Sequence, residues 1–97
     1  MASQFGQRIR ELRTQNNLLL RQVASTINID TALLSKIERG ERPLKKEQII
    51  SLAKLFKVPK NELQTLWLAD QLYNVIEGEP MAGEALKSVT KKLKKVK

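Results

Sequence analysis

The chain has 97 residues, of which 41% are hydrophobic and 4% aromatic, so it has room for one small aliphatic core and not for two full domains. It carries 18 Lys and Arg against 10 Asp and Glu, a formal net charge of +8, which favours a polyanionic partner such as DNA, RNA or an anionic membrane surface. Cysteine and histidine are both absent, which excludes disulfides, thiol nucleophiles, nearly all zinc chemistry and the usual general base.

Apolar residues at helical spacing predict three helices before Gly40. They are expected at Ser3 to about Asn16, Arg21 to Asn28, and Thr31 to Arg39. Asp30 is a good N-cap for the third of these helices, and Gly40 follows its end as a C′ residue should.

The second half of the chain predicts two more helices. Pro43 forbids a straight continuation of the third helix, and a fourth is expected from Lys46 to Phe56. Asn61, with Gln64 three residues later, predicts the N-cap of a fifth helix that runs from Glu62 to about Ile76. The apolar face of this fifth helix is wider than a single small core needs.

The tail from Met81 onward predicts a further helix. Its apolar residues recur at spacings of 4, 3, 4 and 3, which gives a short heptad-like seam of Ala82, Leu86, Val89, Leu93 and Val96. The final twelve residues hold six lysines and no acid. Because β-branched runs of period two do not occur, we expect an all-α protein.

Membrane segments and catalysis are not expected. The longest apolar run is the four residues Leu66 to Ala69, and the N-terminus lacks a charged region followed by an apolar stretch, so neither a transmembrane helix nor a secretory signal is predicted. Serines occur without histidine, and the glycines form no phosphate-cradling loop. We therefore expect no enzyme activity, no cofactor and no metal.

The informative stretch is Leu18 to Gly40, where two short helices are joined by a three-residue turn. Ala24 is small where the two helices must approach, and Ile29 is an apolar plug in the turn. Leu34 and Ile37 are expected to hold the second helix of the pair against the core. The face left free carries the residues Thr31, Ala32, Ser35 and Lys36, with Arg39 near the helix end.

This pattern resembles the phage-repressor/Cro-like (Xre-like) helix-turn-helix family. The matching segments are Ile9…Leu12-Arg13, Leu18…Val23-Ala24, Ile29, Leu34-Ser35-Lys36-Ile37-Glu38-Arg39-Gly40, Arg42-Pro43, Leu52-Ala53 and Val58-Pro59…Glu62-Leu63. The resemblance implies a five-helix repressor-like DNA-binding domain over residues 1–66, followed here by a helical extension over residues 67–97. It makes Thr31–Arg39 the recognition helix, the element that enters the major groove in such motifs.

The resemblance also implies the residues of a DNA interface. Those expected to contact base edges are Thr31, Ala32, Ser35 and Lys36. Arg10 and Arg42 match positions that contact the DNA backbone. Further backbone contacts are expected from other residues of this chain, namely Arg21, Gln22, Arg39, Lys45 and Lys46. Arg13 and Glu38 match an internal ion pair that ties the first helix to the recognition helix.

Two departures from the family pattern change this expectation. Leu19 and Leu20 stand where many members have Ser or Thr followed by Gln, so neither can cap the second helix or bind phosphate, and Arg21 and Gln22 are the available substitutes. Leu44 stands near the position of a groove-directed Arg in some relatives, and the neighbouring Lys45 and Lys46 can compensate.

The sequence thus predicts a cytoplasmic, nucleoid-associated bacterial or phage transcription regulator, a repressor or autoregulator that binds double-stranded DNA as a homodimer. The dimer implies an inverted-repeat operator with half-sites about 34 Å apart. The residues proposed to pack in the dimer or under the tail are Leu66, Trp67, Leu68, Leu72, Tyr73, Ile76, Leu86, Val89 and Leu93. Restriction-modification controllers, antitoxins and phage switches all fit this prediction.

Other interpretations of the chain stay open at this stage. The protein could be an interaction module, such as an antitoxin or anti-regulator whose tail binds a protein partner. Its charge also suits nonspecific nucleic-acid binding, although single-strand readout needs exposed aromatic residues that the sequence does not supply. The lysines from Lys87 to Lys97 fit a solvated end, an extra DNA-backbone contact or an amphipathic partner or membrane contact.

Overall fold

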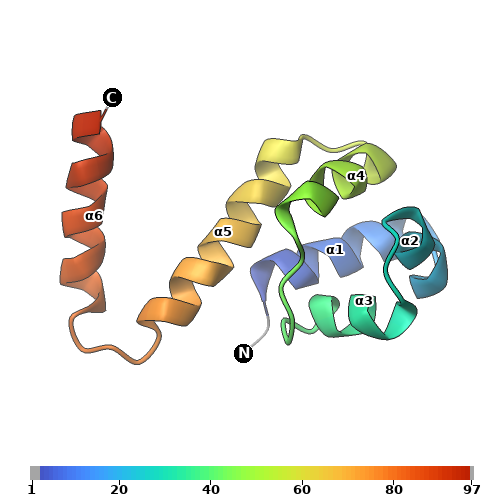
Figure 1. Ribbon diagram of the computed structural model, residues 1–97, viewed down its shortest axis with the longest axis horizontal. Helices are drawn as coiled ribbons and strands as arrows, with labels where there is room; N and C mark the ends of the chain where they lie inside the picture. The colour runs from blue at the N-terminus through green and yellow to red at the C-terminus, as the bar shows by residue number, and fades with distance from the viewer. Residues whose placement is uncertain (1–2, 97) are drawn as a thin grey trace.

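The computed structural model describes residues 3–96, apart from the side chain of Val96. Met1, Ala2, Lys97 and the Val96 position of the predicted seam therefore lie outside what is described. Within the described part the protein is entirely helical, as predicted (Figure 1). The helices are α1 (Gln4–Gln15), α2 (Leu20–Thr26), α3 (Thr31–Glu38), α4 (Lys46–Phe56), α5 (Lys60–Ile76) and α6 (Ala82–Val96). None of these helices is both long and apolar enough to cross a membrane.

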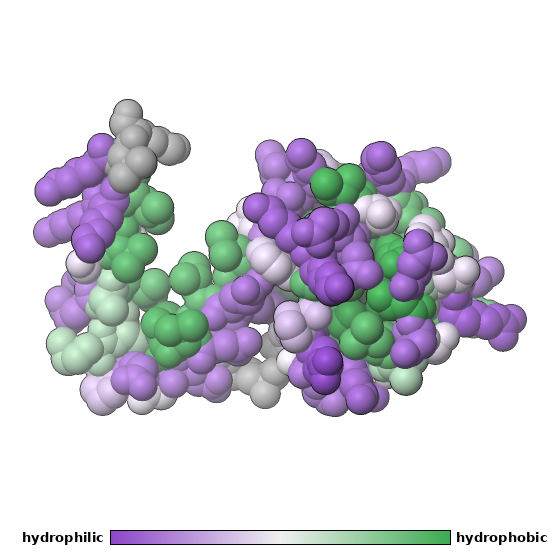
Figure 2. All heavy atoms as spheres, in the orientation of Figure 1, coloured by the Kyte–Doolittle hydropathy of each residue, from purple (hydrophilic) through white to green (hydrophobic). Residues whose placement is uncertain are grey.

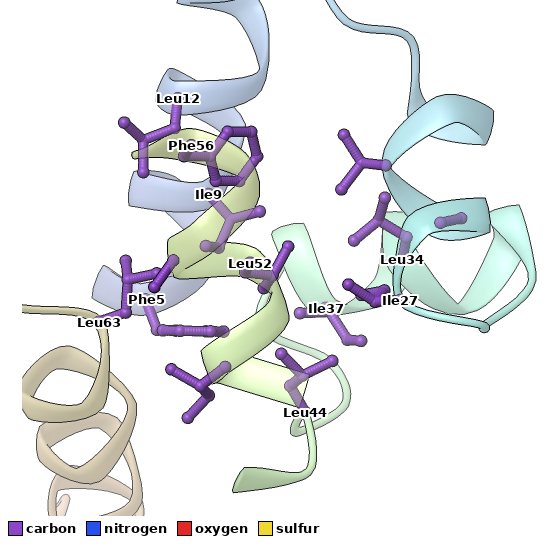
Figure 3. Packing of buried hydrophobic residues seen from close by; sticks show 14 residues of the cluster. Phe5, Ile9, Leu12, Ile27, Leu34, Ile37, Leu44, Leu52, Phe56 and Leu63 are labelled. Carbon is purple, nitrogen blue, oxygen red and sulfur yellow. The ribbon is translucent and has the colours of Figure 1, made fainter. Parts of the chain in front are cut away.

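The first five helices enclose one core of aliphatic and phenylalanine side chains. Its largest fully buried members are Ile9, Leu34, Ile37, Ile49, Leu52, Leu63 and Val23. Side chains from α1, α3, α4 and the start of α5 meet at the centre of this core (Figure 3). No polar or charged residue among those described is buried, so the five helices are held together mainly by apolar contact.

Asp30 and Gly40 cap α3 as predicted, although the helix itself ends at Glu38, one residue before the predicted end, with Arg39 as its C-cap residue. The Asp30 side chain accepts a hydrogen bond from the backbone N–H of Leu33 at 2.7 Å, which is the N-cap contact. Gly40 has a φ of 78° and donates its N–H to the Ile37 carbonyl, while the next N–H, of Glu41, reaches the Lys36 carbonyl at 2.9 Å. These two bonds form a Schellman motif that ends the helix.

Two other predicted boundaries are wrong. α5 begins at Lys60 with Pro59 in the N-cap position, so Asn61 is already helical, and its carbonyl accepts from Thr65 Oγ1. Proline suits a helix start because its φ is fixed and its missing N–H leaves no donor unsatisfied. α2 ends at Thr26 rather than Asn28, because Asn28 takes a left-handed φ of 58°.

α1 and α3 approach each other closely at Gly6. A Cβ atom added to Gly6 would lie 2.6 Å from the carbonyl oxygen of Glu38 and closer still to that of Ile37. Both oxygens belong to the backbone of α3 and cannot swing aside. A side chain at position 6 would therefore push α3 away from α1.

α5 is fastened to the start of α1 by the carboxylate of Asp70. The backbone N–H groups of Gln4 and Phe5 donate to its two oxygens at 3.0 and 2.9 Å, and the Ser3 hydroxyl donates to it as well. These are N–H groups that a helix N-terminus leaves without intrahelical partners. This role of Asp70 cannot be predicted from the sequence pattern, because Asp70 lies far from α1 along the chain.

α6 stands apart from the five-helix body, beyond the connection after Ile76 (Figure 1). The chain measures 42 × 30 × 21 Å with a radius of gyration of 15.1 Å. A compact chain of about 100 residues has a radius of gyration of about 13 Å. α6 therefore does not cover the outer face of α5, one of the two alternatives considered for the tail.

We predict that Gly6→Ala destabilises the protein by about 1–3 kcal/mol, because the added methyl group overpacks the contact between α1 and α3. Chemical unfolding followed by circular dichroism measures the change. Gly83→Ala is the matched control, because nothing lies within 4 Å of its added methyl group. Equal unfolding midpoints for the two variants would contradict the close approach at Gly6.

Candidate nucleic-acid interface

The segment from α2 to α3 forms a tight helix-turn-helix. Ala24 is buried at the point where α2 meets α3 and has no bulk to hold the helices apart. Its carbonyl accepts the N–H of Ile29 at 3.0 Å, and the Ile29 side chain packs on the core. Between them Asn28 makes the left-handed turn, a conformation that asparagine tolerates better than most residues.

α3 has one face in the core and one in water. Leu34 and Ile37 are fully buried, whereas Thr31, Ala32 and Lys36 are exposed. Ser35 is half-buried. The predicted base-contacting residues therefore lie together on the outer side of α3, and three of the four are open to a ligand.

Arg13 and Glu38 join α1 to the end of α3 through a two-bonded ion pair. Arg13 Nε donates to Glu38 Oε2 at 2.7 Å and Nη2 donates to Oε1 at 3.1 Å, while Nη1 donates to the Leu18 carbonyl. Their side chains are only 14% and 6% exposed. The hydrogen bond with Glu38 raises the pKa of the Arg13 guanidinium, against the opposing effect of burial. The pair thus fixes α3 relative to α1 and to the loop that leads into α2.

Arg39, at the end of α3, is engaged within the protein. Its Nε donates to Glu41 Oε2 at 2.7 Å and its Nη1 donates to Ser35 Oγ at 3.1 Å. The hydrogen bond from Arg39 lowers the pKa of Glu41, which is therefore ionised at neutral pH. A phosphate that approaches Arg39 has to compete with this carboxylate.

The start of α2 is capped by Gln22, because the N-cap residue is a leucine and not the Ser or Thr that is typical of the family. Leu19 occupies the N-cap position, where it offers no side-chain hydrogen bond. Gln22 instead reaches back, and its Oε1 accepts the Leu19 N–H at 2.7 Å. Gln22 therefore carries out half of a capping box.

The remaining predicted backbone-contacting residues are all exposed: Arg10, Arg21, Arg42, Lys45 and Lys46. Lys45 is the N-cap residue of α4, and Gln48 supports this helix start, since its Oε1 accepts the Lys45 N–H while its Nε2 donates to the Ile27 carbonyl. Gln48 thereby ties α4 to the turn between α2 and α3.

Leu44 and Trp67 have structural roles that the sequence analysis did not assign. Leu44 is buried, and its carbonyl accepts a hydrogen bond from Trp67 Nε1 at 2.7 Å. Leu44 therefore fills the core beside α5 instead of standing in a groove. Trp67 is partly buried against the core and its N–H is satisfied, so its own chain already packs part of this side chain.

The residues proposed for dimer or tail packing fall into two groups. Leu66 and Trp67 pack on the core of the body, and Ile76 is half-buried. The others are exposed, namely Leu68, Leu72, Tyr73, Leu86, Val89 and Leu93. Large apolar surface is therefore left open along the second half of α5 and along α6.

This fold and this arrangement of α2 and α3 define a helix-turn-helix protein. Residues 4–66 match a family model described as a helix-turn-helix domain. The chain belongs to this family, and the predicted resemblance to repressor- and Cro-like regulators is confirmed. The family is one of DNA-binding transcription regulators.

Two known proteins are each similar to 63% of the chain. An HTH-type transcriptional regulator of Bacillus subtilis (strain 168), RghRB, itself uncharacterized, is 44% identical over 62 residues, which is 63% of this chain and 45% of the relative. The chain thus aligns with less than half of that relative. The crystal structure of the restriction-modification controller protein C.AhdI from Aeromonas hydrophila matches with a TM-score of 0.58 and 34% identity, over 63% of this chain and 92% of the other.

We predict that Glu38→Gln destabilises the protein by about 1–3 kcal/mol, because Arg13 then keeps its charge in a largely buried site without an anionic partner. Urea unfolding of the purified variant measures the loss. Glu41→Gln is the control, since it removes the same charge from a pair in which both side chains are more than half exposed. Its midpoint should stay near that of the wild type, and a loss as large as that of Glu38→Gln would show that burial of the Arg13–Glu38 pair is unimportant.

Proposed function

We propose that the protein is a sequence-specific regulator that binds double-stranded DNA as a homodimer, as a repressor or autoregulator, on an inverted-repeat operator. The observation that carries this proposal is the immobilised recognition helix. α3 is anchored by Leu34, Ile37 and Glu38, and its N-terminal half turns Thr31 and Ala32 outward. Recognition helices of this motif use that half to contact base edges.

The exposed side chains of α3 can contact only a few bases of a DNA site. Lys36 can donate to O6 and N7 of guanine, Thr31 can hydrogen-bond or meet a thymine methyl group, and Ala32 offers apolar contact only. Ser35 can reach a base edge or a phosphate. Few base contacts per protomer mean that two half-sites are needed for a specific operator, which supports the homodimer.

Affinity comes mainly from phosphate neutralisation in this proposal. The predicted backbone-contacting groups are exposed and mostly cationic: Arg10, Arg21, Gln22, Arg39, Arg42, Lys45 and Lys46. Binding should therefore weaken steeply with salt. Residues 1–66 form the DNA-binding unit and residues 67–97 the oligomerisation element. The protein acts where the DNA is, in the cytoplasm of a bacterial cell.

Among narrower roles, the similarity to C.AhdI favours a restriction-modification controller over an antitoxin or a phage switch. This role predicts that the operator lies upstream of the protein's own gene or of a neighbouring restriction-modification gene. The test is therefore the genomic position of the recovered site.

We predict that Thr31→Ala combined with Lys36→Ala abolishes specific binding and leaves nonspecific binding largely intact. Each lost base contact should cost about 1–3 kcal/mol, which is roughly 5- to 150-fold in operator affinity. Footprinting and competition binding at physiological salt measure the change.

The matched control changes the same residue types on another side of the body, at the start of α5 (Figure 1). Lys60→Ala combined with Thr65→Ala alters two exposed side chains there. This variant should retain the operator footprint. A retained footprint for the Thr31 and Lys36 variant would refute α3 as the recognition helix.

A further inference from the structure

Two exposed apolar stripes lie on α5 and α6. Leu68, Leu72 and Val75 recur on α5 at spacings of four and three, and Leu86, Val89 and Leu93 recur on α6 at three and four. All six side chains are between 40% and 76% exposed. At these spacings each set forms one line along its helix.

The two stripes are not closed against each other within one chain. Figure 2 shows apolar surface on the side of α6 that faces the body and on the adjoining half of α5, with open space between them. Contiguous apolar surface of this extent marks an interface in proteins that are stable in water. A second surface of matching shape and charge is needed to cover it.

The charges around α6 are segregated along the chain. From Asn61 to Leu86 there are five acids and no base, and from Lys87 to the end there are six lysines and no acid. Two of the five acids are engaged in the body, since Glu62 binds Arg8 and Asp70 caps α1. The other three, Glu77, Glu79 and Glu84, lie at or just before the start of α6 and are exposed. α6 with its leading connection is therefore acidic at one end and basic at the other.

We propose that two copies of this chain dimerise through an antiparallel pair of α6 helices, with the apolar stripe of each α6 also covered by the α5 stripe of the partner. The inference rests on the homodimer of the proposed function and names the surface that forms it. The antiparallel direction follows from the charges, because it sets the lysine-rich end of one α6 beside the acidic end of the other. A parallel pair would set lysines against lysines and acids against acids, which is unfavourable.

The proposal also agrees with the symmetry and dipoles of such a pair. A two-fold axis brings the same patch of both copies together, so each residue of the patch finds its complement on the other chain. Antiparallel helices also place the positive end of one dipole beside the negative end of the other. The lysines that point away from the stripe stay in water, as they do in the single chain.

A mixing experiment with two charge-reversed variants tests this arrangement. The first variant combines Glu77→Lys with Glu79→Lys, and the second combines Lys92→Glu with Lys94→Glu, the lysines that flank the α6 stripe. Each variant alone sets like charges together, so its dimer dissociation constant should rise at least about tenfold, as measured by analytical ultracentrifugation without DNA. An equimolar mixture restores both attractive contacts and should recover dimers. Folding of α6 back onto its own α5 predicts no recovery on mixing.

Lys91→Glu with Lys95→Glu is the matched control, because it makes the same change of charge on the side of α6 away from the stripe and leaves the ion pair of Lys87 with Glu84 intact. This control should dimerise like the wild type. All the changed residues are exposed and lie outside the core, so circular dichroism should give wild-type unfolding midpoints for every variant.

The outcomes separate this inference from the proposed function. Wild-type dimers that neither variant weakens, or variants that the mixture fails to rescue, overturn the α6 pair, while operator binding by the wild-type dimer would leave the proposed function standing. A wild-type protein that stays monomeric overturns both the pair and the homodimer. Monomers that bind vesicles containing phosphatidylserine through α6 would likewise overturn the pair, in favour of a lipid surface.

Discussion

The contact between α1 and α3 is the constraint on which the rest of the structure depends. Gly6 lets the backbone of α1 lie against the last carbonyls of α3, and Arg13, about two turns further along α1, forms the ion pair with Glu38. These two contacts hold the C-terminal end of α3, while Leu34 and Ile37 hold its inner face. The outer face is thereby presented at a fixed angle, which is what sequence readout by a helix requires.

The side chains that stabilise the five-helix body are largely separate from those on the outer face of α3. Polar side chains satisfy the helix starts, as Asp70 does for α1, Gln22 for α2 and Gln48 for α4. Asp70 and Gln48 also join two elements, since Asp70 belongs to α5 and Gln48 donates to the Ile27 carbonyl. The side chains on the outer face of α3 take almost no part in such capping and joining hydrogen bonds. Arg39 is the exception, because its guanidinium donates to Glu41 and Ser35. A phosphate that binds Arg39 at the end of α3 therefore has to compete with the Glu41 carboxylate.

How far the sequence predicts this structure depends on whether the signal is local. The roles of Asp30 and Gly40 are correctly predicted, because capping and left-handed turns depend on neighbouring residues. The N-cap of α5 is wrongly predicted at Asn61, because Pro59, two residues earlier, already starts the helix. Gly6 and Asp70 were missed because each acts on an element distant in sequence, and a single chain gives no sign of such a partner. The family resemblance predicts α3 as the recognition helix, whereas the open position of α6 follows only from the three-dimensional arrangement.

The most direct test of the central claim is selection of genomic DNA fragments by the purified wild-type protein, at physiological salt and with excess nonspecific competitor. Salt has to be set because phosphate binding at low ionic strength imitates specificity. A homodimeric regulator should recover an inverted repeat whose half-sites have centres about 34 Å apart, upstream of its own gene or a neighbour's. Recovery of no sequence above background would contradict this prediction.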